Sequence, residues 1–378
     1  MTVLMIANIS KSKFEGISKK IFAQARSFSI LEDVCDLICY DENGIYKVHF
    51  VQGNLDSELK IDVFDSMINT NSWKMEILNK ICVNAMKIEK NNDYNIIYIR
   101  HMIPTFNLIK FLSKNKSRHK IYYEIPTYPY FFEQFYNAKN KFKTSLRLVV
   151  ELLFWPFIYL NVHRLIIIQS NSKVHLFKKM IKSYNGYDKN NVPDWKSFPE
   201  IKDLNFIGVG TIYSYHGYDK LILAIKEFTT VSHNFNIFFH IVGDSEEIEN
   251  LKKLVTKLNL QSNIIFYGKQ FGEDLDEIFS NSNIGVGCLA LEKRNADIDT
   301  TIKNVEYIAR RIPFISNGYF YDLDLNNQDY LKISNKNIDL FEIYEFMQNY
   351  YNNKVYHHSE EIVNFFEWKK INEKLLKN

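Results

Sequence analysis

Short apolar runs alternate with longer amphipathic segments along the first half of this chain. The runs are rich in β-branched and aromatic residues, which favours strands, whereas the segments between them carry apolar residues at helical spacing. Alternating strands and helices indicate a parallel sheet covered by helices. The expected strands are 3–9, 36–40, 95–100, 120–125 and 164–169, and the expected helices start near Gly16 and cover about 72–89, 104–114 and 143–160.

The alternation restarts after a polar, turn-rich stretch at 183–199. A chain of 378 residues is also too long for one ordinary domain. We therefore predict an N-terminal domain at 1–185, a C-terminal domain at 186–345, and helices at 346–378 that pack back towards the N-terminal domain. In the C-terminal domain the expected strands are 204–210, 235–243, 263–268, 283–289 and 313–316, separated by helices.

Charge and cysteine content exclude several classes of protein. The formal net charge of +3 gives no concentrated basic excess, so we expect no nucleic-acid partner. The four cysteines are scattered, which favours reduced thiols over disulfides or a zinc site. No GxGxxG follows the first strand, which argues against an NAD-dependent dehydrogenase.

The N-terminus lacks the basic start and cleavage site of a signal peptide, so we expect a cytoplasmic protein. The most apolar stretch, 148–160, is too short to span a membrane and contains Glu151 and Pro156. We interpret it either as a buried helix or as a helix that touches the inner face of the cell membrane. In the second case the basic residues just before it would meet anionic lipid: Lys139, Lys141, Lys143 and Arg147.

Polar groups of the second half gather at strand ends, where doubly wound sheets bind ligands. Gly208 and Gly210, followed by Thr211, end the first strand of this half, and Gly243 ends the next. Glycine at such a point allows a backbone amide to approach a phosphate, although a GxG after a strand can also be only a tight turn.

The helix that follows this glycine turn opens with two basic side chains. His216 and Lys220 are placed to meet an anionic group near a helix N-terminus. The alternative for Lys220 is a solvated helix charge.

A third polar segment opens the helix at about 301–310. Asp299, Thr300 and Thr301 are good N-cap residues, so the first-turn amides are available for a diphosphate. Lys303 adds a cation and shares a helix face with Glu306, whose carboxylate can accept two hydrogen bonds from a ribose diol. The alternative is a Lys303–Glu306 pair on the surface.

These segments, in this order, resemble the C-terminal domain of retaining GT-B glycosyltransferases of the family 4 type. "HGYDKL" (216–221) resembles the HGxDR variant of a helix-opening motif, and "TTIKNVEYIARRIPFI" (300–315) resembles the segment SPLKxxEYxxxGxPxI. Parts of the first half resemble a subgroup tied to bacterial surface polysaccharides: "EGISKKIFAQARSF", "IIYIR" and "YYEIPTYPYFFE". The resemblance covers about residues 1–320.

The resemblance implies an α/β protein of the GT-B fold, with two Rossmann-like doubly wound domains facing a central cleft. It implies a glycosyltransferase that moves a sugar from a UDP- or GDP-linked donor to a glycan or lipid-linked glycan in surface polysaccharide or capsule synthesis. Glu306 would bind the ribose and act with Lys303 in catalysis. The diphosphate would be held by Lys303, His216, Lys220 and the amides of Gly210, Thr300 and Thr301, and the loop around Gly16 would lie near the acceptor.

The chain departs from the family pattern at three points. Ile298 stands where the family often has its first acidic residue, although Asp297 or Asp299 could substitute after a one-residue shift. Residues 310–311 are both arginine where a glycine is usual, and His216 stands where a lysine or arginine is common. The first departure leaves room for a weakened or inactive enzyme.

Acceptor-side candidates follow two strands of the first half. Arg100 and His101 end one strand, and His101 is a candidate acceptor contact or general base, although a lone histidine is often structural. The next strand leads into a proline-rich stretch whose tyrosines could stack on a sugar ring or instead fill core space. Its candidates are Glu124, Thr127 and Tyr128.

We expect neither a metal nor another cofactor, because basic groups can neutralise the charge that builds on a leaving diphosphate. Asp322-Leu323-Asp324 matches the letters of a DxD motif, but it follows the last expected strand and is interpreted as a loop. Two other functions stay open: a non-catalytic GT-B partner of an active transferase, and a nucleotide-sugar epimerase, which shares the two-sheet design.

Overall fold

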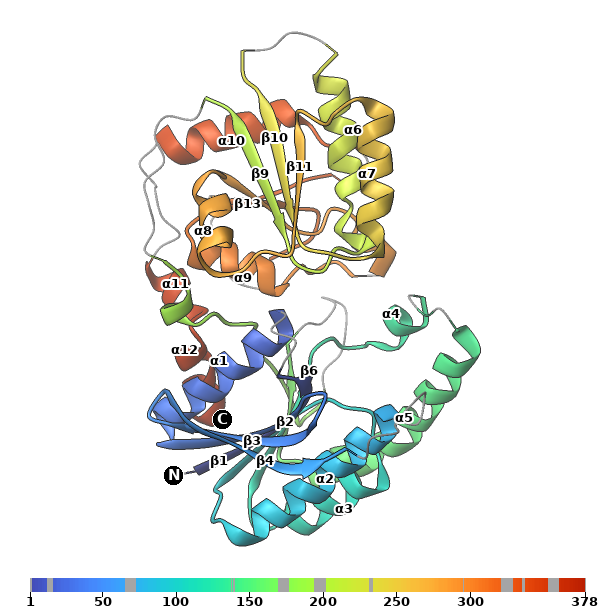
Figure 1. Ribbon diagram of the computed structural model, residues 1–378, viewed down its shortest axis with the longest axis vertical. Coiled ribbons are helices and arrows are strands. Elements are labelled where there is room, and N and C mark those ends of the chain that lie inside the picture. Colours follow the sequence, from blue (N-terminus) through green and yellow to red (C-terminus); the bar gives the residue numbers. More distant parts are fainter. Residues whose placement is uncertain are drawn as a thin grey trace. The chain divides into compact units, whose positions relative to one another are not determined.

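Two sheets, each in its own compact unit, organise the chain (Figure 1). The computed structural model describes residues 2–11, 16–64, 73–136, 138, 140–168, 177–193, 202–230, 234–294, 296–320, 329–334, 337–352 and 360–377. The first unit comprises Met1–Asp188 with Glu367–Asn378, and the second comprises Lys189–Phe366. Among the described helices, none combines the length and the apolar character needed to cross a bilayer.

The first unit is built on a sheet with the strand order β4-β3-β2-β1-β5-β6-β7-β8. Its strands are β1 (Thr2–Ser10), β2 (Val34–Tyr40), β3 (Gly44–Val51), β4 (Asn54–Val63), β5 (Ile96–Arg100), β6 (Lys120–Ile125), β7 (Arg164–Ile167) and β8 (Met180–Lys182). Its helices are α1 (Gly16–Leu31), α2 (Trp73–Asn91), α3 (Phe106–Asn115), α4 (Phe131–Tyr136), α5 (Lys141–Asn161) and α12 (Trp368–Lys377).

Alternation along β1 divides the first unit into two cores. Val3 and Met5 face a cluster that includes Phe28 of α1. Leu4 and Ile6 lie in the other cluster, with side chains of α2, α3 and α5. Because successive side chains of a strand point to opposite faces, this pattern places helices on both faces of the sheet.

A hairpin of β3 and β4 extends this sheet, and the sequence analysis missed it. β3 pairs antiparallel with both β2 and β4, so the expected all-parallel sheet is wrong at this edge. The turn uses Gln52 and Gly53, both with positive φ, as in two-residue hairpin loops. Most of β4 is exposed, so it lacks the apolar run that marked the other strands.

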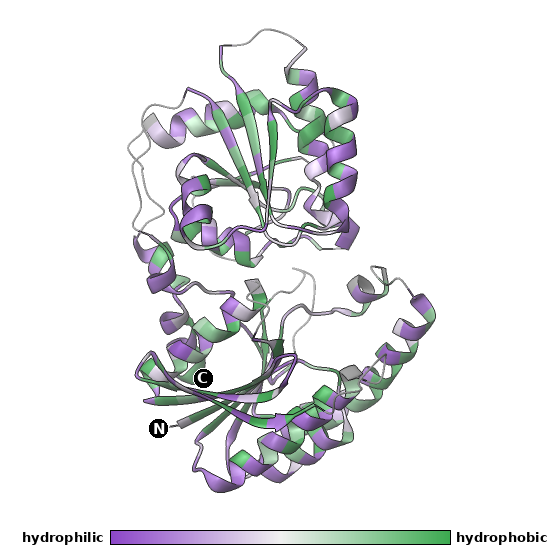
Figure 2. Cartoon of the chain, viewed as in Figure 1, coloured by the Kyte–Doolittle hydropathy of each residue, from purple (hydrophilic) through white to green (hydrophobic). Residues whose placement is uncertain are grey.

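The second unit has an all-parallel sheet with the order β11-β10-β9-β12-β13-β14. Its strands are β9 (Leu204–Val209), β10 (Ile237–Val242), β11 (Ile264–Gly268), β12 (Ile284–Val286), β13 (Phe314–Ser316) and β14 (Tyr330–Lys332). Its helices are α6 (Tyr218–Phe228), α7 (Glu246–Leu258), α8 (Gly272–Ser280), α9 (Ile302–Ala309), α10 (Leu340–Asn352) and α11 (Glu360–Phe365). The central strands are largely apolar in Figure 2, as burial on both faces requires.

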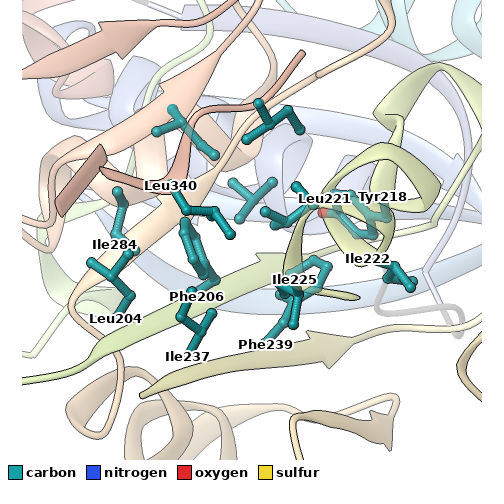
Figure 3. Close-up of a cluster of buried hydrophobic side chains, with 14 of the residues drawn as sticks. Leu204, Phe206, Tyr218, Leu221, Ile222, Ile225, Ile237, Phe239, Ile284 and Leu340 are labelled. Atoms are coloured by element: carbon teal, nitrogen blue, oxygen red, sulfur yellow. The ribbon is translucent and has the colours of Figure 1, made fainter. Parts of the chain in front are cut away.

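Side chains from strands and helices interlock in the core of the second unit. Phe206 of β9 and Phe239 of β10 lie among Leu221 and Ile225 of α6, and Leu340 of α10 reaches the same cluster (Figure 3). This core fixes the strand ends from which the polar loops of the unit emerge.

The C-terminal helices divide between the two units, unlike the single returning segment expected at 346–378. Ile343, Met347 and Tyr351 of α10 are buried in the core of the second unit, so this helix belongs there. The last helix, α12, packs on α1 of the first unit, where Trp368 is buried and Asn372 donates to the Ser27 hydroxyl at 3.1 Å.

Glycines with positive φ end three neighbouring strands of the second unit: Gly210 after β9, Gly243 after β10 and Gly268 at the end of β11. The Gly243 amide donates to the Gly268 carbonyl at 2.7 Å, and a Cβ added to Gly243 would lie 1.8 Å from the Gly210 carbonyl oxygen. The close approach of these turns therefore requires glycine at 243.

We expect Gly243→Ala to destabilise the second unit by about 2 kcal/mol or more, because it adds a backbone clash to a strained φ. Gly268→Ala is the matched control: its φ is also positive, but its Cβ would meet no atom within 4 Å, so strain alone should cost about 1 kcal/mol. Urea unfolding measures the loss of stability in both variants, and hydrogen exchange of the β9 and β10 amides shows whether the loss lies in the second unit. Equal losses would show that the close approach is unimportant.

Candidate functional site

Lys303 on the first turn of α9 is a buried cation at the carboxyl edge of the second sheet. Its side-chain nitrogen donates to the Gly287 carbonyl at 3.0 Å and to the Tyr218 hydroxyl at 3.3 Å, and it lies 5.1 Å from the centre of the Tyr218 ring. The residue is 7% exposed. Neither hydrogen-bond partner is a carboxylate, so the ammonium is positioned by neutral groups and can attract an anion.

Glu306 lies one turn further along α9 and does not pair with Lys303. Its Oε1 accepts from Arg310 Nε at 3.1 Å, and Arg310 also donates to Asp276 of α8 at 2.7 Å. The Glu306 side chain is 29% exposed. The alternative of a Lys303–Glu306 surface pair is therefore wrong, and Arg310, which the sequence analysis noted only as a departure, orients the carboxylate.

His216 is buried, and its role as a cation is corrected. Burial lowers the pKa of His216 well below its ordinary value, and the charges of Lys303 and Arg294 lower it further. Its Nδ1 accepts from the Tyr213 amide at 3.0 Å, which leaves the proton of the neutral ring on Nε2. His216 can therefore offer a neutral N–H donor, but not a positive charge.

Lys220 is held by groups of its own unit. Its side-chain nitrogen donates to the Leu289 carbonyl at 3.1 Å and forms an ion pair with Glu292 at 2.7 Å. Lys220 is therefore not simply a helix charge in water, because it is bound to two groups of the protein. A ligand anion would have to compete with Glu292 for this cation.

Asp299 is structural in this arrangement, contrary to its assignment as a donor contact. It is fully buried, and its carboxylate accepts from the Cys288 amide at 2.7 Å, the Ser316 hydroxyl at 2.8 Å and the Thr301 hydroxyl at 3.0 Å. These bonds tie the start of α9 to the ends of β12 and β13, so Asp299 is a poor substitute for the acidic residue missing at Ile298. Thr300 is buried beside it.

The two glycines at the end of β9 differ in their surroundings: Gly208 lies within the strand and Gly210 follows it. A Cβ on Gly208 would lie 2.4 Å from the Tyr218 hydroxyl, so this glycine makes room for an aromatic ring, and its assignment to phosphate contact is corrected. Gly210 and Thr211 are exposed, and a Cβ on Gly210 would meet nothing within 4 Å. Thr211 is therefore open to a ligand, but the Gly210 amide donates to the Val242 carbonyl at 3.0 Å, so its assignment as a diphosphate contact is corrected.

Glu124 of the first unit is buried in a charge network, so its assignment as an acceptor contact is corrected. Its carboxylate pairs with Lys20 at 2.9 Å and Arg100 at 2.5 Å, and it accepts from the Tyr98 hydroxyl at 2.7 Å. Burial alone would raise the pKa of Glu124, but Lys20 and Arg100 lower it to about 2. Burial lowers the pKa of Lys20 to about 8. The network ties α1 to β5 and β6.

His101 lines a cavity of about 140 Å³ in the first unit. The other lining residues are Pro126, Thr127, Tyr130 and Gln134. The His101 ring lies 4.8 Å from the Tyr130 ring, its Nδ1 is 3.1 Å from the Tyr123 hydroxyl, and its Nε2 is 3.5 Å from Glu151 of α5. Ligand pockets are usually larger than about 300 Å³, so this cavity can hold only part of a ligand.

The structure brings His101 and Thr127 together at this cavity, whereas Arg100 and Glu124 pair with each other in the buried charge network. Tyr128 packs against the core of the first unit, which supports the core-filling alternative. Gly16 is exposed at the start of α1, next to residues 12–15, which lie outside the described residues. The sequence analysis missed Tyr130, Gln134 and Glu151 as neighbours of His101.

In the part of the chain that the structure describes, no three His, Cys, Asp or Glu side chains lie close enough together to hold a metal ion. Residues 322–324, with the DxD letters, lie outside that part.

Comparisons with known proteins found a family model that matches part of the second unit. Residues 193–319 match the family described as Glycosyl transferases group 1. A search of curated proteins found no match. A solved sucrose-phosphate synthase from Thermosynechococcus elongatus is similar over 100% of this chain and 98% of its own, with a TM-score of 0.66 and 12% identity.

Two further solved structures are similar along their whole length. The lipopolysaccharide outer core galactosyltransferase WaaB covers 100% of this chain and 99% of its own, with a TM-score of 0.58 and 14% identity. Anabaena HepE in complex with UDP has the same coverage, with a TM-score of 0.60 and 13% identity. The predicted GT-B fold with two α/β units is therefore confirmed, and the family match supports a glycosyltransferase.

We expect Glu124→Gln to destabilise the first unit by about 3–5 kcal/mol at pH 7, because it leaves Lys20 and Arg100 buried without a carboxylate. The pKa of Glu124 is about 2 in the folded state, below the ordinary 4.5, so its contribution is present above pH 4.5 and is lost as the pH falls towards 2. The difference from wild type should therefore shrink over this window.

Urea unfolding at several pH values measures this effect. Glu76→Gln is the control, because its pair with Lys80 (3.9 Å) lies on the surface and should contribute less than about 1 kcal/mol. A Glu124→Gln difference that stays constant from pH 5 to pH 2 would contradict the assignment.

Proposed function

We propose that this glycosyltransferase moves a sugar from a UDP- or GDP-linked donor to a glycan or lipid-linked glycan, with retention of configuration and without a metal. The observation that carries the proposal is the buried Lys303 ammonium at the carboxyl edge of the second sheet, with Glu306 one turn further on. Both lie within the residues that match the group 1 glycosyltransferases. HepE, solved with UDP, and WaaB, a galactosyltransferase, have the same fold.

The donor diphosphate is proposed to lie against the start of α9 and the turn after β9. The amides of Thr301, Ile302 and Lys303 open α9 and can donate to phosphate oxygens, whereas the Asn304 amide already donates to the Thr301 carbonyl at 3.1 Å. Lys303 supplies the positive charge, and His216 supplies a neutral N–H. Glu306, held by Arg310, accepts hydrogen bonds from the ribose diol.

Charge builds on the diphosphate as the bond to the sugar breaks. A cation and amides that are already fixed in place stabilise this charge without reorganising, which is usually a large part of catalysis. Lys303 fits this role because its nitrogen is held by the Gly287 carbonyl and the Tyr218 hydroxyl before any ligand arrives.

The acceptor is proposed to bind at the first unit, with a hydroxyl at His101 in the cavity shared with Thr127. Glu151 lies 3.5 Å from His101 Nε2 and would stabilise a proton taken up by the imidazole. The suggested pathway is bacterial surface polysaccharide or capsule synthesis. A lipid-linked acceptor would place the enzyme in the cytoplasm, in peripheral contact with the inner face of the cell membrane.

We expect Lys303→Met and Glu306→Gln each to reduce sugar transfer by at least about a hundredfold, because each removes a group that acts on the donor. The assay measures release of UDP or GDP from a panel of nucleotide sugars, with and without glycan acceptors. Lys257→Met and Glu342→Gln are the matched controls, because they make the same changes on exposed helix positions.

Thermal unfolding of each variant separates loss of function from loss of fold. A folded Lys303→Met or Glu306→Gln protein with wild-type turnover would remove the donor-site assignment. A wild-type chain that binds donors and turns none over would support the non-catalytic partner. An isomerised donor formed without any acceptor would support the epimerase.

A further inference from the structure

Helix α5 presents an apolar stripe to solvent. The stripe consists of six side chains with exposures from 53% to 80%: Phe142, Leu146, Val149, Leu153, Phe157 and Leu160. At about 100° per residue they fall within an arc of about 80° and extend over about 27 Å of the helix. The buried residues Leu148, Glu151 and Ile158 lie on the opposite side, so the stripe is not part of the core.

The neighbouring helix α3 continues the same surface. Its Phe106 is 83% exposed and lies against Phe154 of α5, with ring centres 5.3 Å apart. Lys110 and Lys114 are exposed on the solvent face of α3, one and two turns after Phe106. Figure 1 shows α3 and α5 in the same region of the first unit. An apolar surface of this extent on a soluble unit marks an interaction site.

The charged residues at the ends of the stripe are basic. Lys141 and Lys143 are exposed at the start of α5, and Lys178 and Lys179 lie near its end, where Lys179 donates to the Tyr159 carbonyl at 2.9 Å. Residues 101–123 and 138–168 contain a single acidic residue, Glu151, whose side chain is only 2% exposed. The two ends of the stripe and the solvent face of α3 therefore attract anions.

A second copy of the chain fits this surface poorly. Lysines lie at the start of α5 and, from residues 178–179, beside its end, so parallel and antiparallel pairing of two stripes would each bring basic groups together. A partner with an apolar interior under a negatively charged outer layer would match both the stripe and the lysines. The apolar side chains would enter the interior, and the lysines would stay at the charged layer.

We propose that α5, with Phe106 of α3, docks in the plane of an anionic phospholipid bilayer, with the stripe in the acyl boundary and the flanking lysines at the headgroups. The proposal deepens the proposed use of a lipid-linked acceptor by naming the surface that meets the lipid. Lipid binding needs no sugar donor, so it can be tested separately from sugar transfer.

The test uses co-sedimentation of the full chain with vesicles of phosphatidylcholine, alone or mixed with phosphatidylglycerol. Wild type should bind the mixed vesicles, and added salt should weaken binding. Leu146→Gln with Leu153→Gln should lower the partition coefficient by at least about a hundredfold, because two apolar side chains no longer enter the bilayer. The matched control is Leu59→Gln with Leu223→Gln, which makes the same change at exposed leucines outside the stripe.

A second pair of variants tests the charge. Lys141→Gln with Lys143→Gln should lower the partition coefficient by about thirtyfold, whereas Lys253→Gln with Lys257→Gln on α7 should leave it unchanged. This pair keeps the test decisive if the leucine variant does not fold.

Three results would overturn the proposal: no binding of wild type to the mixed vesicles, wild-type binding by the folded leucine variant, or wild-type binding by the Lys141/Lys143 variant. Light scattering adds a fourth. A wild-type dimer that the leucine variant converts to a monomer, with vesicle binding unchanged, would assign the stripe to a second copy. None of these results depends on whether sugar transfer is detected.

Discussion

The buried ammonium of Lys303 makes the contacts on which the carboxyl edge of the second sheet depends. A charge of this kind is costly to bury unless polar groups surround it, and here the end of β12 and the first residue of α6 supply them. The same contacts draw α6, α9 and β12 together at one edge of the sheet. Asp299 adds hydrogen bonds from β12 and β13. The edge is therefore ordered by its own polar contacts.

The first unit uses a buried charge for a different purpose. Glu124 is surrounded by Lys20, Arg100 and Tyr98, so every oxygen of its carboxylate is occupied within the unit. This network holds α1 against the strand ends, whereas nearby His101 keeps contact with a cavity. Two polar residues that follow neighbouring strands thus differ in role because one is enclosed and the other borders open space.

Periodicity identified most strands and helices, because buried parallel strands are continuous apolar runs. It missed β3, where buried and half-buried residues are mixed, and the largely exposed β4, although Gln52-Gly53 is a recognisable turn. Motif order predicted Lys303 and Glu306 as donor-site residues, and this stays a prediction, but Asp299 and Glu124 were misassigned because spacing does not reveal which carboxylates are enclosed. Arg311 stands where the segment that this chain resembles usually has glycine. Its φ of +57° is a strained value for arginine, which the sequence does not reveal.

The apolar residues of α5 show a further limit of sequence patterns. The sequence of a helix that is apolar on most sides does not show which side is buried. A buried helix and a helix that binds an apolar surface are therefore expected to have the same kinds of residues. The fold uses only one side: Leu148 and Ile158 pack inward, whereas Phe142 and Leu153 contact water. Polar residues at the outer positions would leave the core intact, so the fold does not account for the stripe. A partner that the apolar side chains enter does account for it, and the lysines at the start of α5 and beside its end favour an anionic one.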